Sequence, residues 1–183
     1  MSRITQIAPE TAVGKSKELL EAVKSKLGLV PNMTRAMATS PAVLDGYLQF
    51  SGSLSHGKLS AKIREQIALA VGQENQCDYC LAAHSTIGKM VGLTADQILD
   101  SRVGQAVDPQ TSVLLNFAKR VVSQKGQIND ADIEAVRKAG FDDGIIAEVV
   151  ANVALNIFTN YFNQVAGTDI DFPKAADLKR VAS

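Results

Sequence analysis

The chain of 183 residues is poor in cysteine and histidine, with two of each. Structural zinc sites usually take their ligands from two separate pairs, and no second cysteine pair exists here. An excess of either charge is also missing, because 19 lysine and arginine residues balance 19 aspartate and glutamate residues. A neutral chain lacks the attraction that draws proteins to nucleic acids or anionic membranes. We therefore expect neither of them as a partner.

Long apolar runs are missing as well. No run reaches the roughly 18 residues of a membrane span, and Glu148 and several polar residues interrupt the longest apolar-rich stretch, 145–162. The first twelve residues contain Pro9 but no apolar core of a signal peptide. We therefore expect a cytoplasmic protein. In that compartment thiols are kept reduced. A close pair of cysteines therefore indicates catalysis or metal binding in preference to a structural crosslink.

Segments with the two-residue period of β-strands are absent, and every periodic stretch is helical. With 46% hydrophobic and 21% charged residues, the sequence predicts one globular all-α domain over residues 1–183, with about eight to ten helices. We expect helices at 10–27, 41–53, 60–74, 75–91, from 94, and at 109–123, 129–138 and 142–165. An extended segment at 168–173 and a last short helix are expected to follow.

The helix expected at 142–165 is apolar nearly all round. A helix of this kind is buried either in the core or in a subunit interface. A domain of this size rarely has room to cover such a helix completely, so we expect a homo-oligomer. The alternative is a core helix in a monomer, because apolar content is a weak guide to interfaces.

The two cysteines and one histidine lie close together, as Cys77-Asp78-Tyr79-Cys80 and His84. With Asn75 as N-cap, Cys77 falls in the first helical turn, where free N–H groups and the helix dipole favour a thiolate. Cys77, Cys80 and His84 then share one helix face. His84 can take the proton of Cys80, and Cys77 can attack an oxidised Cys80. The geometry alone does not decide which cysteine reacts first, since thioredoxin-like chemistry would choose Cys77.

A carboxylate near His84 would hold its ring in a useful state, and the preceding helix offers Glu65. Its helical neighbours are small or apolar: Ala68, Leu69 and Gly72. A charge in such surroundings needs a partner, and we expect that partner to be His84. The competing acid, Glu74, lies at the helix end, where a solvated charge is expected.

Other interpretations of these residues remain open. The cysteines could be small buried hydrophobic residues, or could bind zinc together with His84 and Glu65. We expect Tyr79 to be a packing residue; the alternative is a catalytic role. His56 lies in a Ser-His-Gly loop and is expected at the surface.

Glu65, eleven intervening residues, Cys77-x-x-Cys80 and then His84 form a pattern that resembles the AhpD-like alkylhydroperoxidases of the carboxymuconolactone decarboxylase superfamily. The segments 64–71, 30–32 and 158–163 are also similar to that family, the last to its peroxidase-related branch. The resemblance covers nearly the whole chain. The spacing of the glutamate, the cysteine pair and the histidine is its most specific part.

This resemblance implies an all-α fold in trimers or hexamers and a thiol-dependent hydroperoxide reductase without a cofactor. Cys80 would attack a small hydroperoxide, Cys77 would resolve the product, and His84 with Glu65 would relay the proton. An external dithiol or disulfide reductant would restore the pair. Tyr79 departs from the family pattern, which has a histidine just before the second cysteine. The alternatives are a lactone enzyme using His84 and Glu65 as acid and base, and a non-enzymatic redox-sensing or zinc-binding module.

Overall fold

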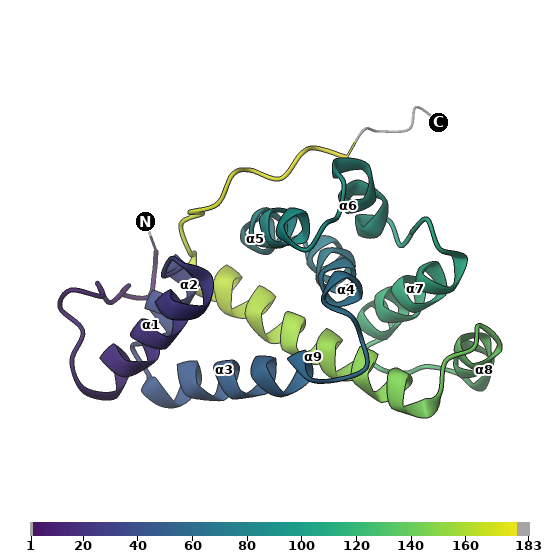
Figure 1. Ribbon diagram of the computed structural model, residues 1–183, viewed down its shortest axis with the longest axis horizontal. Coiled ribbons are helices and arrows are strands. Elements are labelled where there is room, and N and C mark those ends of the chain that lie inside the picture. Colours follow the sequence, from purple (N-terminus) through teal and green to yellow (C-terminus); the bar gives the residue numbers. More distant parts are fainter. Residues whose placement is uncertain (1, 179–183) are drawn as a thin grey trace.

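The computed structural model describes residues 2–178, and over these residues the chain forms nine α-helices and no strand (Figure 1). This confirms the all-α expectation. The helices are α1 (Gly14–Leu27), α2 (Asn32–Met37), α3 (Pro41–Ser55), α4 (Ala61–Glu74), α5 (Asp78–Met90), α6 (Ala95–Arg102), α7 (Pro109–Ser123), α8 (Asp130–Lys138) and α9 (Asp143–Ala166).

Local capping explains where most helices begin. Thr94 and Gln97 form a capping box at the start of α6, and Asn129 and Asp132 form another at α8. α9 ends at Gly167, which adopts the left-handed conformation that glycine accepts without steric cost. These boundaries agree with the sequence expectation because they depend on neighbouring residues only.

Two helices near the N-terminus differ from expectation. α1 begins at Gly14 and not at residue 10, because residues 8–11 form a turn closed by a hydrogen bond from Ala12 N to Ala8 O. The short helix α2 was not expected, since no helix was predicted between residues 27 and 41. Pro31 occupies the N-cap position of α2. The expected last helix is not formed over residues 174–178, and residues 179–183 lie outside the described residues.

α4 lies at the centre of the molecule and contacts α5, α6, α7 and α9 (Figure 1). Seven consecutive residues of α4, from Gln66 to Gly72, are buried, so this helix is covered on all sides. One apolar core joins α4 to α7, α8 and α9, and a second joins α1, α2 and α3. Glu65 therefore lies on the central helix of the fold, against which α5, α6, α7 and α9 pack.

α9 turns its polar residues inward. Its buried face includes Asn152, Asn156, Thr159, Asn160 and Asn163. Its exposed residues include large apolar side chains, which we call the outer face of α9: Val150, Phe158, Tyr161 and Val165. Among the described residues, α9 is the one helix whose length and composition would allow it to cross a membrane. In this structure α9 packs against α3, α4, α5 and α7. The expected helix was apolar nearly all round, whereas the observed helix has a polar inner face and an apolar outer face.

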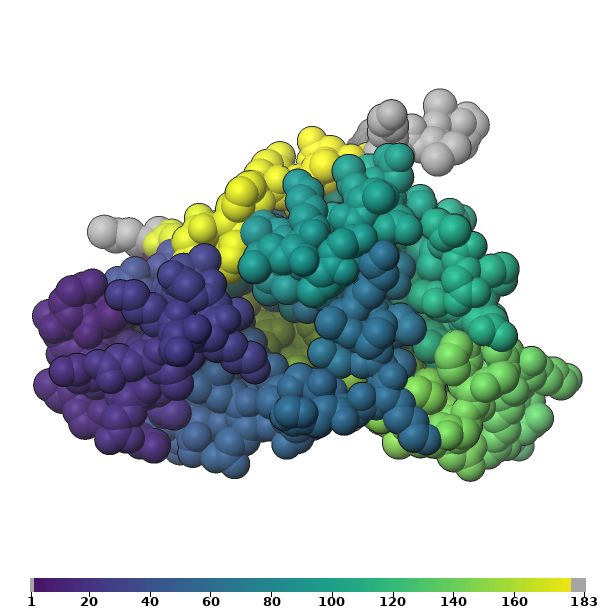
Figure 2. Space-filling model, viewed as in Figure 1, coloured from purple at the N-terminus to yellow at the C-terminus, as the bar shows by residue number. Residues whose placement is uncertain are grey.

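The residues that follow α9 form an extended C-terminal segment, 168–178, which crosses α5 and reaches α6 (Figure 1). Figure 2 shows this segment, in yellow, lying against the teal surface of α5. Asp171 Oδ2 accepts a hydrogen bond of 2.7 Å from the backbone N–H of Asn32. Arg102 donates to the carbonyl oxygen of Ala176. The segment is therefore fastened at both ends of its path over α5.

Candidate active site

The Cys-x-x-Cys pair lies at the start of α5, but the helix begins two residues later than expected. Asn75 is the C-cap of α4, not the N-cap of α5, and Gln76 adopts a left-handed φ of 52° that separates the two helices. Cys77 is the N-cap itself, and its Sγ accepts a hydrogen bond of 3.3 Å from the N–H of Cys80. Cys80 therefore lies in the first turn, where free N–H groups and the helix dipole favour a negative sulfur.

Cys77 and Cys80 are joined by a disulfide, with their Cα atoms 5.3 Å apart. Both residues are buried, with exposed fractions of 2% and 3%. They form a small apolar cluster with Tyr79 and Ala83, against which Met33 and Phe172 pack. The structure thus contains the oxidised form of the pair, in a site from which water is largely excluded.

Glu65 and His84 meet across the α4–α5 contact, as the sequence predicted. His84 Nδ1 lies 2.7 Å from Glu65 Oε2, and both side chains are partly buried. An ionised carboxylate only accepts hydrogen bonds, so Nδ1 carries the hydrogen and Nε2 is left as the basic nitrogen. Within residues 2–178 no hydrogen bond joins His84 to either sulfur of the disulfide. In this oxidised form, the hydrogen-bonded pair and the disulfide are therefore not joined by a hydrogen bond of their own.

Tyr79 makes packing and positioning contacts. Its hydroxyl accepts a hydrogen bond of 3.2 Å from the N–H of Met33 in α2, and its ring meets Phe172 edge-on at 5.8 Å. Burial strongly raises the pKa of Tyr79, and the carboxylate of Asp171 raises it further. Tyr79 thus holds α2 and the C-terminal segment against the cysteines as a neutral phenol.

The other titratable residues considered from the sequence lie elsewhere. Glu74 pairs with Lys119 of α7 at 3.3 Å and is only partly exposed, so the expectation of a solvated terminal charge is wrong. His56 is the exposed C-cap residue of α3. Among residues 2–178, no group of three or more histidine, cysteine, aspartate or glutamate side chains could hold a metal ion. The zinc interpretation therefore gains no support from the geometry.

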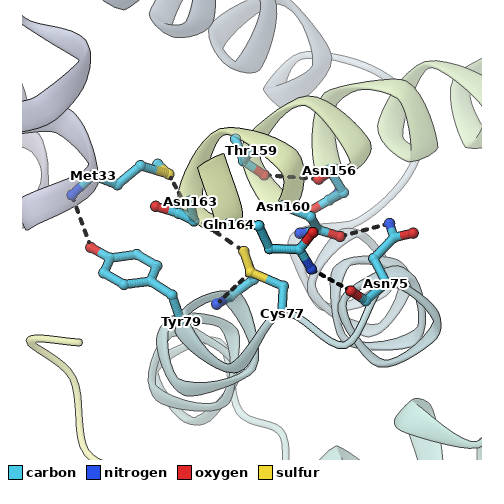
Figure 3. Close-up of a disulfide and its surroundings, with 10 residues drawn as sticks. Met33, Asn75, Cys77, Tyr79, Asn156, Thr159, Asn160, Asn163 and Gln164 are labelled. Atoms are coloured by element: carbon cyan, nitrogen blue, oxygen red, sulfur yellow. Dashed lines mark hydrogen bonds between the residues drawn. A yellow bond between two sulfur atoms is a disulfide. The ribbon is translucent and has the colours of Figure 1, made fainter. Parts of the chain in front are cut away.

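Three residues near the site were not identified from the sequence: Tyr47, Met33 and Asn163. Burial, followed by the nearby charge of Glu65, raises the pKa of Tyr47 to about 12. The side-chain nitrogen of Asn163 lies 3.4 Å from Cys80 Sγ and 3.2 Å from Met33 Sδ (Figure 3). Two signals pointed to Asn163: it ends the family-like segment 158–163, and α9 carries asparagines in an otherwise apolar sequence.

Residues 41–123 match the sequence model of the carboxymuconolactone decarboxylase family. Among solved structures, the chain is similar to a peroxidase-related protein from Ralstonia eutropha JMP134, described as an alkylhydroperoxidase AhpD core. The two chains are 25% identical, the similarity covers 93% of this chain and 92% of the other, and the TM-score is 0.84.

A peroxidase-related protein from Silicibacter sp. TM1040 is 24% identical, with 90% and 89% of the two chains covered and a TM-score of 0.80. A variant of the debrominase Bmp8, in complex with 2,3,4-tribromopyrrole, has the same fold at 15% identity, with 93% and 92% covered and a TM-score of 0.80. A comparison with curated protein sequences gave no significant match. The family match over residues 41–123, the cysteine pair and these structural similarities support a relationship between this chain and the AhpD-like carboxymuconolactone decarboxylase superfamily.

Proposed function

We propose that this protein is a thiol-dependent hydroperoxide reductase. The observation that carries the proposal is the buried disulfide of Cys77 and Cys80 at a helix start, beside the hydrogen-bonded pair of Glu65 and His84. A vicinal pair of this kind can accept and release two electrons. The adjacent acid–base pair supplies the proton transfer that peroxide reduction requires.

In the reduced enzyme, the Cys80 thiolate attacks the terminal oxygen of a hydroperoxide, R–O–O–H. The O–O bond breaks, the sulfur is oxidised by two electrons to a sulfenic acid, and R–O⁻ takes a proton and leaves as an alcohol. The sulfur of Cys77 then attacks Cys80, forming the S–S bond and releasing water. An external dithiol returns two electrons and two protons to the pair and becomes a disulfide itself.

The roles of His84 and Glu65 follow from their contact. Nε2 of His84 takes the proton from Cys80, directly in the reduced enzyme or through one bridging water, and returns it to the leaving alkoxide. Glu65 holds the ring through Nδ1 and stabilises the imidazolium that forms. Glu65 is therefore a positioning residue, whereas His84 acts on the reacting sulfur.

The proposal includes the cellular setting. A disulfide that is opened and closed in each turnover suits the reducing cytoplasm, where dithiol reductants are available. We also propose that the protein is a homo-oligomer, a trimer or hexamer, because the outer face of α9 leaves large apolar side chains uncovered.

The first experiment follows thiols and peroxide together. Reduced protein treated with one equivalent of tert-butyl hydroperoxide should lose two thiols per chain without crosslinks between chains. Cys80→Ser should reduce peroxide consumption to the uncatalysed rate, because the attacking sulfur is gone. Cys77→Ser should accumulate a sulfenic acid on Cys80, detectable by dimedone labelling and mass spectrometry. Full peroxide consumption by Cys80→Ser would contradict the proposal.

The two histidines give a matched comparison in the same assay. His84→Ala should lower the turnover rate by about 10²- to 10⁴-fold, the usual contribution of a general acid–base group. His56→Ala, at an exposed position, should leave the rate unchanged. Equal rates for the two variants would remove His84 from the mechanism.

One observation favours a second candidate. The contact between Glu65 and His84 does not involve the sulfurs, so it could also serve as an acid–base pair on a lactone. A lactone-converting activity that survives replacement of both cysteines by serine would favour this candidate over the peroxidase.

A further inference from the structure

Asn163 directs its amide group at two sulfur atoms. Its side-chain nitrogen lies 3.4 Å from Cys80 Sγ and 3.2 Å from Met33 Sδ. An asparagine amide carries two N–H groups, so one of them can point at each sulfur. Figure 3 shows Asn163 of α9 between Met33 and the disulfide.

The surroundings of Asn163 argue against a purely structural role. The residue is 4% exposed, and its Oδ1 is buried without a hydrogen-bond partner. Buried polar atoms are nearly always paired, and the exceptions call for an explanation such as a catalytic role. A side chain kept only for packing would be better replaced by an apolar one. The contact of its nitrogen with sulfur is therefore the reason to keep an amide here.

Neighbouring residues of α9 fix the position of the same turn. Asn160 Oδ1 accepts a hydrogen bond of 2.9 Å from Asn75 Nδ2, and Gln164 donates to the carbonyl oxygen of Asn75 (Figure 3). Asn75 lies two residues before Cys77. The inner face of α9 thus holds the chain entering the cysteine pair, which keeps Asn163 aligned with Cys80.

We propose that Asn163 is a further catalytic residue, whose amide N–H stabilises the thiolate of Cys80 in the reduced enzyme. The inference rests on the proposed thiol chemistry and adds a residue that the cysteine–histidine–glutamate set lacks. A hydrogen bond to a charged acceptor is roughly twice as strong as one to a neutral acceptor. The contact seen with the disulfide sulfur is therefore strengthened when the pair is reduced.

Two measurable properties depend on this contact. Stabilising the thiolate increases the fraction of Cys80 that can react at neutral pH. It also favours the reduced pair over the disulfide in an equilibrium with an external dithiol. Neither property requires a hydroperoxide.

The test uses Asn163→Asp, which keeps the shape, removes the donor and adds a carboxylate that repels a thiolate, and Asn163→Leu, which removes the amide without adding a charge. In a Cys77→Ser background, Cys80 is the single thiol, and its alkylation by iodoacetamide is followed from pH 5 to pH 9. Both variants should react about tenfold more slowly at pH 6, the effect of losing one hydrogen bond to a charged group. Their pH–rate profiles should move to higher pH.

Asn156→Leu is the matched control, because Asn156 lies on the same face of α9, is 6% exposed and donates only to the α9 backbone at Asn152 O. Its profile should match that of the parent. With both cysteines present, the Asn163 variants should also shift the dithiothreitol equilibrium toward the disulfide. A folded Asn163 variant with the parent profile would overturn the inference, as would an equal shift in Asn156→Leu.

The outcomes remain separable from those of the proposed function. Alkylation and dithiol equilibria report on the sulfur alone, so a protein that does not consume peroxide can still show the Asn163 effect. Conversely, the protein could consume peroxide while its Asn163 variants are alkylated at the parent rate. That result would support the proposed function and contradict the role of Asn163. If Asn163→Leu does not fold, Asn163→Ala, which also removes the amide without adding a charge, decides the matter.

Discussion

At the scale of single residues, two tyrosines lie beside the site and neither is free to ionise. Tyr79 accepts a hydrogen bond from Met33, and burial raises its pKa strongly. For Tyr47, burial and then the charge of Glu65 raise the pKa to about 12. Both phenols therefore keep their protons at neutral pH, so neither tyrosine adds an ionised group to the proposed proton relay.

The pKa of Tyr47 predicts a loss of stability at high pH. An unfolded tyrosine ionises near pH 10, whereas folded Tyr47 holds its proton until about pH 12. Between these values the unfolded state binds fewer protons, so the free energy of unfolding falls as the pH rises. No stability is lost through Tyr47 below pH 10, and the loss grows to at most about 3 kcal/mol by pH 12.

Urea denaturation of the wild type and of Tyr47→Phe, from pH 8 to pH 12, measures this contribution as the difference between the two curves. The difference should grow above pH 10 in favour of Tyr47→Phe. Tyr161→Phe, which removes a hydroxyl from an exposed ring, serves as the control. Parallel curves for wild type and Tyr47→Phe would contradict the assignment.

At the scale of elements, α9 fastens the loop between α3 and α4. The two carboxylate oxygens of Glu148 accept hydrogen bonds from the N–H groups of Lys58 at 2.8 Å and Leu59 at 3.0 Å. A Cβ on Gly57 would lie only 2.5 Å from Glu148 Oε2, so a larger residue there would displace the carboxylate from this contact. Because this loop leads into α4, the contact also helps to fix the helix that carries Glu65.

Glu148→Ala should lower the free energy of unfolding by about 1–3 kcal/mol, because the N–H of buried Leu59 loses its partner. The urea midpoint should fall while the dependence of the free energy on urea concentration stays constant. Glu134→Ala removes an acid from an exposed pair with Arg137 and should change stability by less than about 1 kcal/mol. Equal losses for the two variants would count against a special role for Glu148.

At the scale of the whole molecule, α9 departs from the usual arrangement of a surface helix, in which apolar residues face the core and polar residues face the solvent. Its four asparagines and Thr159 point inward, and Phe158, Tyr161 and Val165 point outward. These positions recur at three- and four-residue intervals and so form one continuous strip. A strip of this kind marks an interaction surface, and we propose that a second copy of the chain covers it.

Tyr161→Glu and Val165→Glu test this proposal, since both residues are more than half exposed in the single chain, at 54% and 65%. Sedimentation should show that each change converts the oligomer to smaller species. Met90→Glu places the same charge on an apolar residue of α5 that is 74% exposed, and should leave the assembly intact. A wild-type protein that sediments as a monomer at micromolar concentration would contradict the proposal.

The sequence predicted what depends on neighbouring residues and missed what depends on distant ones. The start of a helix at Thr94 follows from local chemistry and is confirmed. The start of α5 was misplaced at Asn75, because the turn there is held from α9. The contact of Glu65 with His84 could be predicted, since a charge among apolar neighbours needs a partner. The contact of Asn163 with Cys80 could not, because it depends on how α9 is rotated in the fold.

The two faces of α9 connect the chemistry of the site with the protein concentration. The inner face carries Asn163 against Cys80, and the outer face is the one proposed to bind a second copy. A subunit contact that favours one position of this helix stabilises the folded chain by mass action. Dilution below the dissociation constant would then loosen the helix that aligns the sulfur. Specific activity should therefore fall at low enzyme concentration even though every residue of the site belongs to one chain.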